Sequence, residues 1–446
     1  MTKIEQFKRD SFYGIGNAGM AIVNIVVQTW LIYFFAPPEG RVLLPATVIG
    51  SIWFFGRIVD AVSDPLISNW SDRLKSKLGR RLPFLFYTAL PLAVVMFLLF
   101  FEPIFSGPAV LSGIILALLL GLFYFLFTAY AVPYLALIPD LSRNRADRLN
   151  LSTSSALFNL VGTAAAMILC GMLLSVFSST EDFSSSAFIP VMLIMAAIAF
   201  LTFILTPAGL YKYRKTGTGG TNMNVLKAMK MVFKNKAFVI YVFGMNIFWG
   251  GFIIINVSVP YYVTVLMGKS ADFTSIALGC TLGVALIFFT IINWGARRFG
   301  NRRVMLICTL MLAIVLSLIY FIPHGLFGLS PMLSGLILMA LAGAPIAGLF
   351  ILPNVMVAEL SDFILPDGTK PGEAIYYGVQ GVINKFVIGI VTLFAGILFD
   401  TFGATAGNSL GVQLTGPIGG VFALFAFFMF LKYPSDIKKR EQTVAE

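Results

Sequence analysis

Long apolar stretches recur along the whole chain, and they restrict its fold more than any other feature. A helix needs about 20 residues to cross a bilayer core of ~30 Å, and twelve stretches approach or exceed that length. They are too long for the strands of a membrane barrel and lack strict polar–apolar alternation. We therefore predict an all-α integral membrane protein with twelve transmembrane helices. The stretches cover residues 12–36, 44–71, 83–101, 109–138, 150–177, 186–210, 237–266, 273–294, 303–322, 332–358, 374–399 and 414–433.

Composition supports this reading and excludes several classes of protein. Apolar residues make up 58% of the 446 positions and charged residues only 11%, whereas a soluble domain carries about 25% charged residues. A soluble enzyme, a disordered chain and a nucleic-acid binder are therefore excluded. The 3 cysteines lie inside apolar stretches and the single histidine is His324. That pattern offers no metal-ligand spacing, so we expect no bound metal and no cofactor.

The distribution of Lys and Arg predicts the orientation in the membrane. Nearly all of them fall in the N-terminus, the even-to-odd loops and the C-terminal tail, and Arg41 and Lys269 alone fall in the opposite loops. Because cytoplasmic loops carry the excess of positive charge, both termini are expected in the cytoplasm. We expect a multi-pass protein of the cell (inner) membrane, a monomer whose surroundings are the lipid bilayer, with no nucleic-acid partner.

The longest loop divides the chain into two halves. Residues 211–236 follow the sixth stretch and combine a Gly/Thr centre with a basic amphipathic segment, which predicts a cytoplasmic linker. The halves are 1–210 and 237–446, each with six helices. The loops from Ser68 and Ile292 share Asn-Trp and a basic Gly-Arg-Arg-like turn, a weak internal repeat. Two pseudo-symmetric six-helix bundles match the plan of the major facilitator fold.

Two acidic residues lie deep in the second stretch, which reads GRIVDAVSDP. Asp60 and Asp64 are four residues apart and so project from one helical face, with Arg57 close to it. Ionisable groups inside membrane spans are costly and mark functional sites by default. Two carboxylates this close need a shared proton or a cation between them. The alternative is a static Arg57–Asp60 bridge that only fixes packing.

Lys385 is the expected counter-charge from the other half. It lies about as far from the cytoplasmic end of its stretch as Asp60 does, which places both about 16 Å deep at ~1.5 Å per residue. We therefore expect the two residues to meet at the interface between the halves. Replacing Asp60 or Asp64 with Asn is expected to abolish cation-coupled uptake while leaving folding intact.

Four segments together resemble a known family. YGIGNAG in the first stretch, GRIVDAVSDPLISNWSDRLKSKLGRRLPF across the second, VPYLALIPDL ending the fourth and GEAIYYGVQGVINKF in the eleventh are similar to the glycoside–pentoside–hexuronide:cation symporters, the family of melibiose permease. The resemblance implies symport of a sugar, glycoside or related small neutral solute with Na⁺, Li⁺ or H⁺ by alternating access. It implies cation-binding roles for Asp60, Asp64, Ser63 and Thr128, and coupling roles for Lys385 and, beside the acids, Arg57.

The sugar-binding positions of that family are not matched here. Its acids align with Ala21 and Ala131, and its aromatic platform aligns with Leu135. Amide stripes on the cavity-facing helices suggest a neutral pocket in their place, although amides inside spans often only join helices. The predicted substrate-binding residues are Asn17, Ala21, Asn24, Gln28, Ala131, Tyr134, Trp249, Tyr377, Gln380 and Asn384.

The loop after the second stretch resembles the cytoplasmic signature of major facilitator transporters. Its charges are expected to bridge helices when the cytoplasmic side is shut. The predicted gating residues are Asp72, Arg73, Arg80 and Arg81.

The paired acids are also compatible with two other functions. A prenyltransferase could hold Mg²⁺-diphosphate on Asp60, Asp64 and Asp72, but the chain lacks a second Asp-rich turn, so we expect no enzyme. A cation-coupled transporter of lysolipids or other amphiphiles is the stronger alternative, since relatives of the family keep the paired acids.

Overall fold

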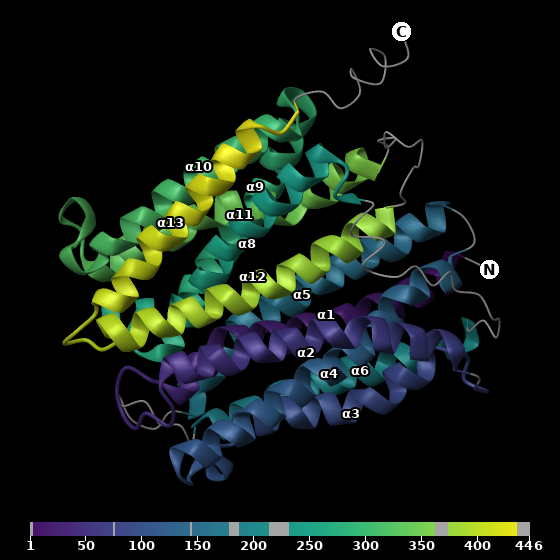
Figure 1. Ribbon diagram of the computed structural model, residues 1–446, viewed down its shortest axis with the longest axis horizontal. Helices are drawn as coiled ribbons and strands as arrows, with labels where there is room; N and C mark the ends of the chain where they lie inside the picture. Colours follow the sequence, from purple (N-terminus) through teal and green to yellow (C-terminus); the bar gives the residue numbers. More distant parts are fainter. Residues whose placement is uncertain are drawn as a thin grey trace. The chain divides into compact units, whose positions relative to one another are not determined.

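The computed structural model describes residues 3–74, 76–142, 145–177, 187–213, 232–361 and 373–434, and these are almost wholly helical (Figure 1). The only β-pairing among them is an isolated bridge between Thr405 and Asn408. Eleven helices of the described residues are long and apolar enough to cross a membrane. The chain forms two compact units: Met1–Asn222 with Ser270–Ile276, and Met223–Lys269 with Ala277–Glu446. The predicted linker 211–236 lies largely outside the described residues.

Six long helices build unit 1. They are α1 (Lys3–Phe35), α2 (Ala46–Arg73), α3 (Leu82–Leu98), α4 (Ala109–Leu141), α5 (Arg145–Phe177) and α6 (Phe188–Leu210). Helix α1 packs mainly on α5 and α6, and α4 packs on α2 and α3. Most of the α1 surface is buried, because its apolar residues and three glycines surround the helix on every side.

Unit 2 has the same number of long helices. They are α8 (Lys236–Tyr261), α9 (Thr274–Phe299), α10 (Asn301–Leu318), α11 (Pro331–Ser361), α12 (Glu373–Phe402) and α13 (Leu410–Leu431). A π-helical turn, Tyr262–Leu266, extends α8. Helices α8 and α10 both pack along α13, as Figure 1 shows for the α10–α13 pair.

The third predicted span is shorter than expected. We predicted 83–101, but α3 ends at Leu98 and has 17 residues. Phe100 and Phe101 donate to the carbonyls three residues before them, so the α-helical ladder ends here, and Pro103 has no N–H to resume it. At ~1.5 Å per residue, α3 is slightly shorter than a ~30 Å bilayer core. The chain therefore has eleven full-length apolar helices and one short one among the residues described.

Close contact between α1 and α5 depends on a glycine. A Cβ on Gly162 would lie 2.7 Å from the Cα of Ala18 and would also meet its carbonyl, so it would overlap backbone that cannot turn aside. We expect Gly162→Ala to lower the free energy of unfolding by about 1–3 kcal/mol, because overpacking forces the helices apart. Gly113→Ala on α4 is the matched control. Its Cβ would meet nothing within 4 Å, and better helix propensity should leave stability equal or higher. Thermal unfolding in detergent checks both, and equal loss in the two variants would contradict the reading.

Candidate functional site

Asp60 lies at the centre of a buried polar cluster between α2 and α4. Its Oδ1 accepts a hydrogen bond of 2.5 Å from the Thr128 hydroxyl, and its Oδ2 lies 3.3 Å from Nη1 of Arg57. Asp60 and Thr128 are each only 1% exposed, and Arg57 is 4% exposed. Helix periodicity explains the meeting, because Arg57 and Asp60 are three residues apart on α2 and face α4. Both carboxylate oxygens are therefore engaged.

An aromatic side chain of α4, Tyr124, completes this cluster. The Arg57 guanidinium stacks over the Tyr124 ring, 4.4 Å from its centroid, and Tyr124 lies four residues before Thr128 on the same face of α4. A Cβ on Gly56 would come within 2.8 Å of that ring, so glycine is what admits it. Nε and Nη2 of Arg57 make no hydrogen bond to the described residues. The cluster thus contains one buried guanidinium, that of Arg57, whose N–H donors are only partly used.

The other two predicted cation ligands lie on the same helix. The Ser63 hydroxyl donates to the Val59 carbonyl one turn earlier at 2.5 Å, which leaves its lone pairs able to accept. Asp64 is half-buried. Pro65 follows and cannot donate to the Ala61 carbonyl, so the α2 hydrogen-bond ladder is broken beside the two acids. Carboxylate, hydroxyl and carbonyl oxygens are the ligands that hard cations prefer.

Several predicted substrate residues lie in a polar network of unit 1 that joins helices. Asn17 on α1 donates to the Ser155 carbonyl and hydroxyl on α5, at 3.1 and 2.9 Å, and accepts from Asn159 at 3.2 Å. The Tyr134 hydroxyl on α4 donates to the Tyr13 carbonyl at 2.8 Å, and the two rings stack 4.5 Å apart. These side chains act as interhelical links, which is the alternative the sequence left open.

The remaining positions in unit 1 are only partly enclosed. Ala21 and Gln28 are buried at 6% and 5% exposure, whereas Asn24 and Ala131 are half-buried. The side chains around these four residues do not indicate a particular ligand.

Unit 2 holds the predicted residues of α8 and α12. Gln380 accepts a hydrogen bond of 3.1 Å from the Tyr241 hydroxyl, which fixes its amide. The Asn384 side-chain oxygen is buried without a hydrogen bond in the described residues. Trp249 is half-buried and packs edge-on against Phe252 and Phe350. The Tyr377 side chain lies outside the described residues.

The expected meeting of Lys385 with Asp60 joins residues of different units. Lys385 is half-buried on α12 in unit 2. In unit 1 the positive group that contacts Asp60 is Arg57. The Lys385–Asp60 pairing therefore stays a prediction.

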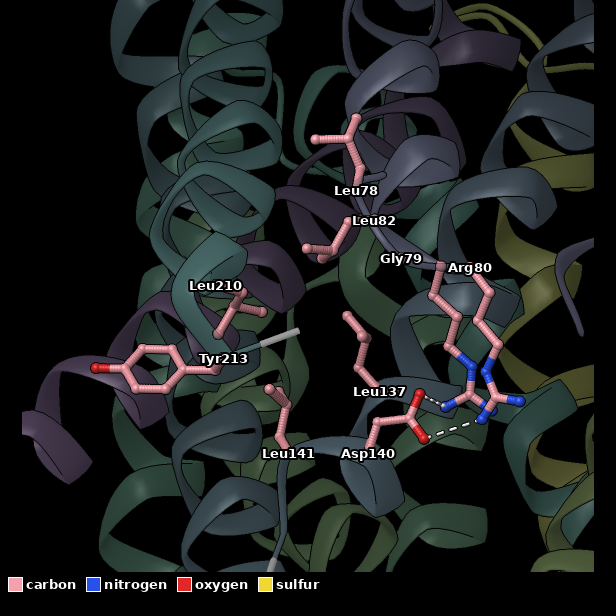
Figure 2. A pocket seen from close by; sticks show the side chains of 10 residues that line it. Leu78, Gly79, Arg80, Leu82, Leu137, Asp140, Leu141, Leu210 and Tyr213 are labelled. Atoms are coloured by element: carbon pink, nitrogen blue, oxygen red, sulfur yellow. Dashed lines mark hydrogen bonds and ion pairs between the residues drawn. The ribbon is translucent and has the colours of Figure 1, made fainter. Parts of the chain in front are cut away.

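The predicted gating residues divide into two groups. Figure 2 shows the Asp140 carboxylate, at the end of α4, facing the Arg80 side chain in a small cavity; Arg80 lies 3.1 Å from Oδ1 and Arg81 2.7 Å from Oδ2. The cavity measures about 10 Å³, close to the least that holds one water. Arg73 is exposed, and the Asp72 side chain lies outside the described residues.

Sequence reasoning did not single out several residues of these clusters. Asp140 lies within VPYLALIPDL, but nothing in its spacing points to the arginines that it contacts. Tyr124 could have been found, because it precedes Thr128 by one helical turn. Buried Arg9 forms a further ion pair at this end of unit 1, with Asp10 at 2.7 Å and Asp147 at 3.5 Å.

Solved structures with the same arrangement of helices are major facilitator transporters. The nucleoside transporter NupG covers 97% of this chain over 100% of its own length, at 17% identity and a TM-score of 0.64. A bacterial homologue of the human lysosomal transporter Spinster, solved inward-facing and unoccupied, covers 96% at 13% identity and a TM-score of 0.66. At these identities the likeness concerns the fold alone. The predicted fold class is confirmed: this is an all-α, multi-pass membrane protein with the architecture of a transporter.

Sequence comparison gives the family. The model for the MFS/sugar transport proteins matches residues 12–433. The isoprimeverose transporter of Lactiplantibacillus pentosus is 26% identical over 402 residues, covering 90% of this chain and 81% of that protein. The sodium-dependent lysophosphatidylcholine symporter 1 of Xenopus tropicalis is 24% identical over 445 residues, covering 90% and 82%. The chain belongs to the glycoside–pentoside–hexuronide:cation symporter family of the major facilitator superfamily.

Proposed function

We propose that this protein is a symporter that couples the movement of Na⁺, Li⁺ or H⁺ to uptake of a sugar, glycoside or similar small neutral solute by alternating access. The observation that carries the proposal is the buried Asp60 carboxylate, held by the Thr128 hydroxyl and Arg57. A carboxylate this deep in a membrane span is costly unless it has a task. Its neighbours Ser63 and Asp64 add further oxygen atoms on the same helix.

Arg57 gives this site a means of coupling. It neutralises Asp60 when no transported ion is present, and its contact of 3.3 Å is long for a charged pair. A cation that enters must compete with the guanidinium for Asp60. Arg57 can then turn its two unused nitrogens toward other acceptors. Lys385 of unit 2 is the proposed second coupling residue, and it would sense the same change of charge from α12.

A second candidate substrate class is a lysolipid or another amphiphile. The similarity to the lysophosphatidylcholine symporter supports it over 90% of the chain. The engagement of Asn17 with Ser155 and Asn159 supports it as well, because those amides are then used between helices rather than for sugar hydroxyls.

Transport into proteoliposomes tests the proposal. Purified protein is offered labelled glycosides or a labelled lysophospholipid under an inward Na⁺ gradient, an inward H⁺ gradient, or none. We expect accumulation of one class under one gradient, lost when an ionophore collapses it. Asp64→Asn should remove accumulation, whereas Glu39→Gln in an exposed loop should not. Accumulation that ignores both gradients would refute coupling.

Membrane orientation is part of the proposal. We infer an inner-membrane protein with both termini in the cytoplasm, because the basic residues gather in the loops of that side. A cysteine added at residue 3 should react with a membrane-impermeant maleimide only after cells are permeabilised. Labelling of intact cells would show that the N-terminus lies outside the cytoplasm and would contradict the proposed orientation.

Thr128 is expected to set the affinity for the cation. Thr128→Val removes a hydrogen bond to a charged carboxylate, worth about 1.5–3 kcal/mol. The cation concentration for half-maximal uptake should rise by about tenfold or more. Thr88→Val is the matched control, because the Thr88 hydroxyl donates only to its own helix at Phe84. Equal effects of the two variants would argue against Thr128 as part of the cation site.

A further inference from the structure

An apolar groove runs along the outside of unit 2 between α10 and α13. Its volume is about 360 Å³, within the range of small-molecule sites. Leu310, Ile314 and Phe321 line one side, and Val421 and Leu424 line the other. These five side chains are between 38% and 55% exposed. In a protein that spans a membrane, such a groove faces hydrocarbon rather than water.

A glycine shapes the floor of the groove. A Cβ on Gly420 would lie 2.5 Å from the Ser317 hydroxyl and 2.9 Å from the Ala313 carbonyl, so only glycine lets α13 approach α10 this closely. The Ser317 hydroxyl is turned away into a 2.8 Å hydrogen bond to that same carbonyl. The floor therefore presents no free donor, as an acyl chain requires.

A cluster of arginines stands at the start of α10. Arg297 and Arg298 end α9, Gly300 turns the chain with a φ of 87°, and Arg303 lies in the first turn of α10. All three arginines are exposed, and none forms an ion pair with the described residues. The intervening Arg302 is used differently, because it donates to the last carbonyls of α13, Phe430 at 3.2 Å and Leu431.

Aromatic side chains lie beside one of the exposed arginines, Arg298. The Arg298 guanidinium lies 5.3 Å from the centre of the Trp294 ring and 5.6 Å from that of Phe299. Both rings are about half exposed, at 54% and 46%. Tryptophan and arginine at the end of an apolar helix are typical of the headgroup region.

The two features are spaced as the two ends of a phospholipid are. Leu310 follows Arg303 by seven residues of helix, which is about 10 Å along the axis. A phosphate at Arg303 thus leaves room for the glycerol unit before the groove begins. We propose that unit 2 binds an anionic phospholipid, with its phosphate at the arginines of the α9–α10 turn and one acyl chain in the α10–α13 groove.

The positive charge of the arginines in the α9–α10 turn favours an anionic lipid. Three uncompensated arginines at one turn repel each other and attract a headgroup with net negative charge more than a zwitterionic one. Orientation in the membrane alone accounts for positive charge on this side. It does not account for a groove with an apolar floor that begins one lipid backbone away from that charge. With the orientation proposed above, the lipid belongs to the cytoplasmic leaflet.

Native mass spectrometry of the full chain tests the proposal, with dioleoyl phosphatidylglycerol and dioleoyl phosphatidylcholine as probes. Wild type should bind the phosphatidylglycerol more tightly. Arg298→Gln with Arg303→Gln should weaken that binding by about fivefold for each charge removed and leave phosphatidylcholine little changed. The matched control removes two other exposed charges of unit 2, Lys236→Gln with Lys432→Gln, and should keep the preference.

The groove is tested separately. Val421→Trp places a large side chain in it at an exposed position and should weaken binding of both lipids without altering the preference between them. Soluble glycerol phosphate should not displace the bound lipid, because it has no chain for the groove. The proposal is overturned if the arginine variant binds phosphatidylglycerol as wild type does, if the lysine variant loses as much, or if glycerol phosphate displaces the lipid. Elution and thermal unfolding like wild type show that each variant is folded.

Discussion

Replacing Asp60 with Asn is expected to lower the free energy of unfolding by about 3–5 kcal/mol as well as to abolish accumulation of substrate. The sequence alone led us to expect a folded, uncoupled protein. The structure changes this expectation, because the carboxylate contacts Arg57, which is 4% exposed. Its loss leaves a buried guanidinium without a counter-charge. Chemical or thermal unfolding in detergent measures the first effect, and gradient-driven uptake the second.

A double variant separates the two effects. Arg57→Met together with Asp60→Asn removes both charges, so stability should return to within about 1 kcal/mol of wild type. Accumulation should remain absent, because the proposed cation ligand is still missing. A cycle of the two single variants and the double variant gives the coupling energy between the side chains. Glu39→Gln, which removes an exposed carboxylate, is the control for loss of charge alone. Additive effects of the single variants would show that the ion pair contributes nothing.

Asp140→Asn should have the second largest effect. The carboxylate lies between Arg80 and Arg81, and the three side chains are only 9–15% exposed. Its loss leaves two nearly buried guanidiniums close together. We expect a loss of about 2–3 kcal/mol, less than for a fully buried pair because water still reaches this end of the helices.

The loss of the Asp140 contacts should loosen the loop between α2 and α3, and hydrogen exchange can measure this. The loop between α2 and α3 should exchange its amide hydrogens faster in the variant, because the α4 contact no longer holds it. Asp272→Asn, a half-buried acid outside this cluster, should leave that exchange unchanged. If loop exchange in Asp140→Asn equals wild type, the bridge does not hold the loop to α4. Arg81→Met should disturb the loop less than Asp140→Asn, since Arg80 keeps its partner.

Local patterns in the sequence were enough to predict the fold. Whether a segment crosses a membrane depends on the sum of its own transfer free energies, so the apolar stretches could be counted without knowing what they pack against. The face shared by Asp60 and Asp64 follows from helix period. The family resemblance rests on segments such as GRIVDAVSDP, and the family model matches the chain from residue 12 to 433.

Only the tertiary structure showed which side chains of different helices contact each other. The sequence could not show that Thr128 of α4 donates to Asp60, that Asp140 holds two arginines, or that Asn17 is engaged by α5. Each contact depends on how one helix is rotated and shifted along its neighbour, and packing of the whole bundle sets that rotation. Hydropathy carries almost no information about that rotation, because a helix in lipid is apolar on most sides. The sequence therefore determined which residues lie in the membrane, whereas packing determined which of them meet.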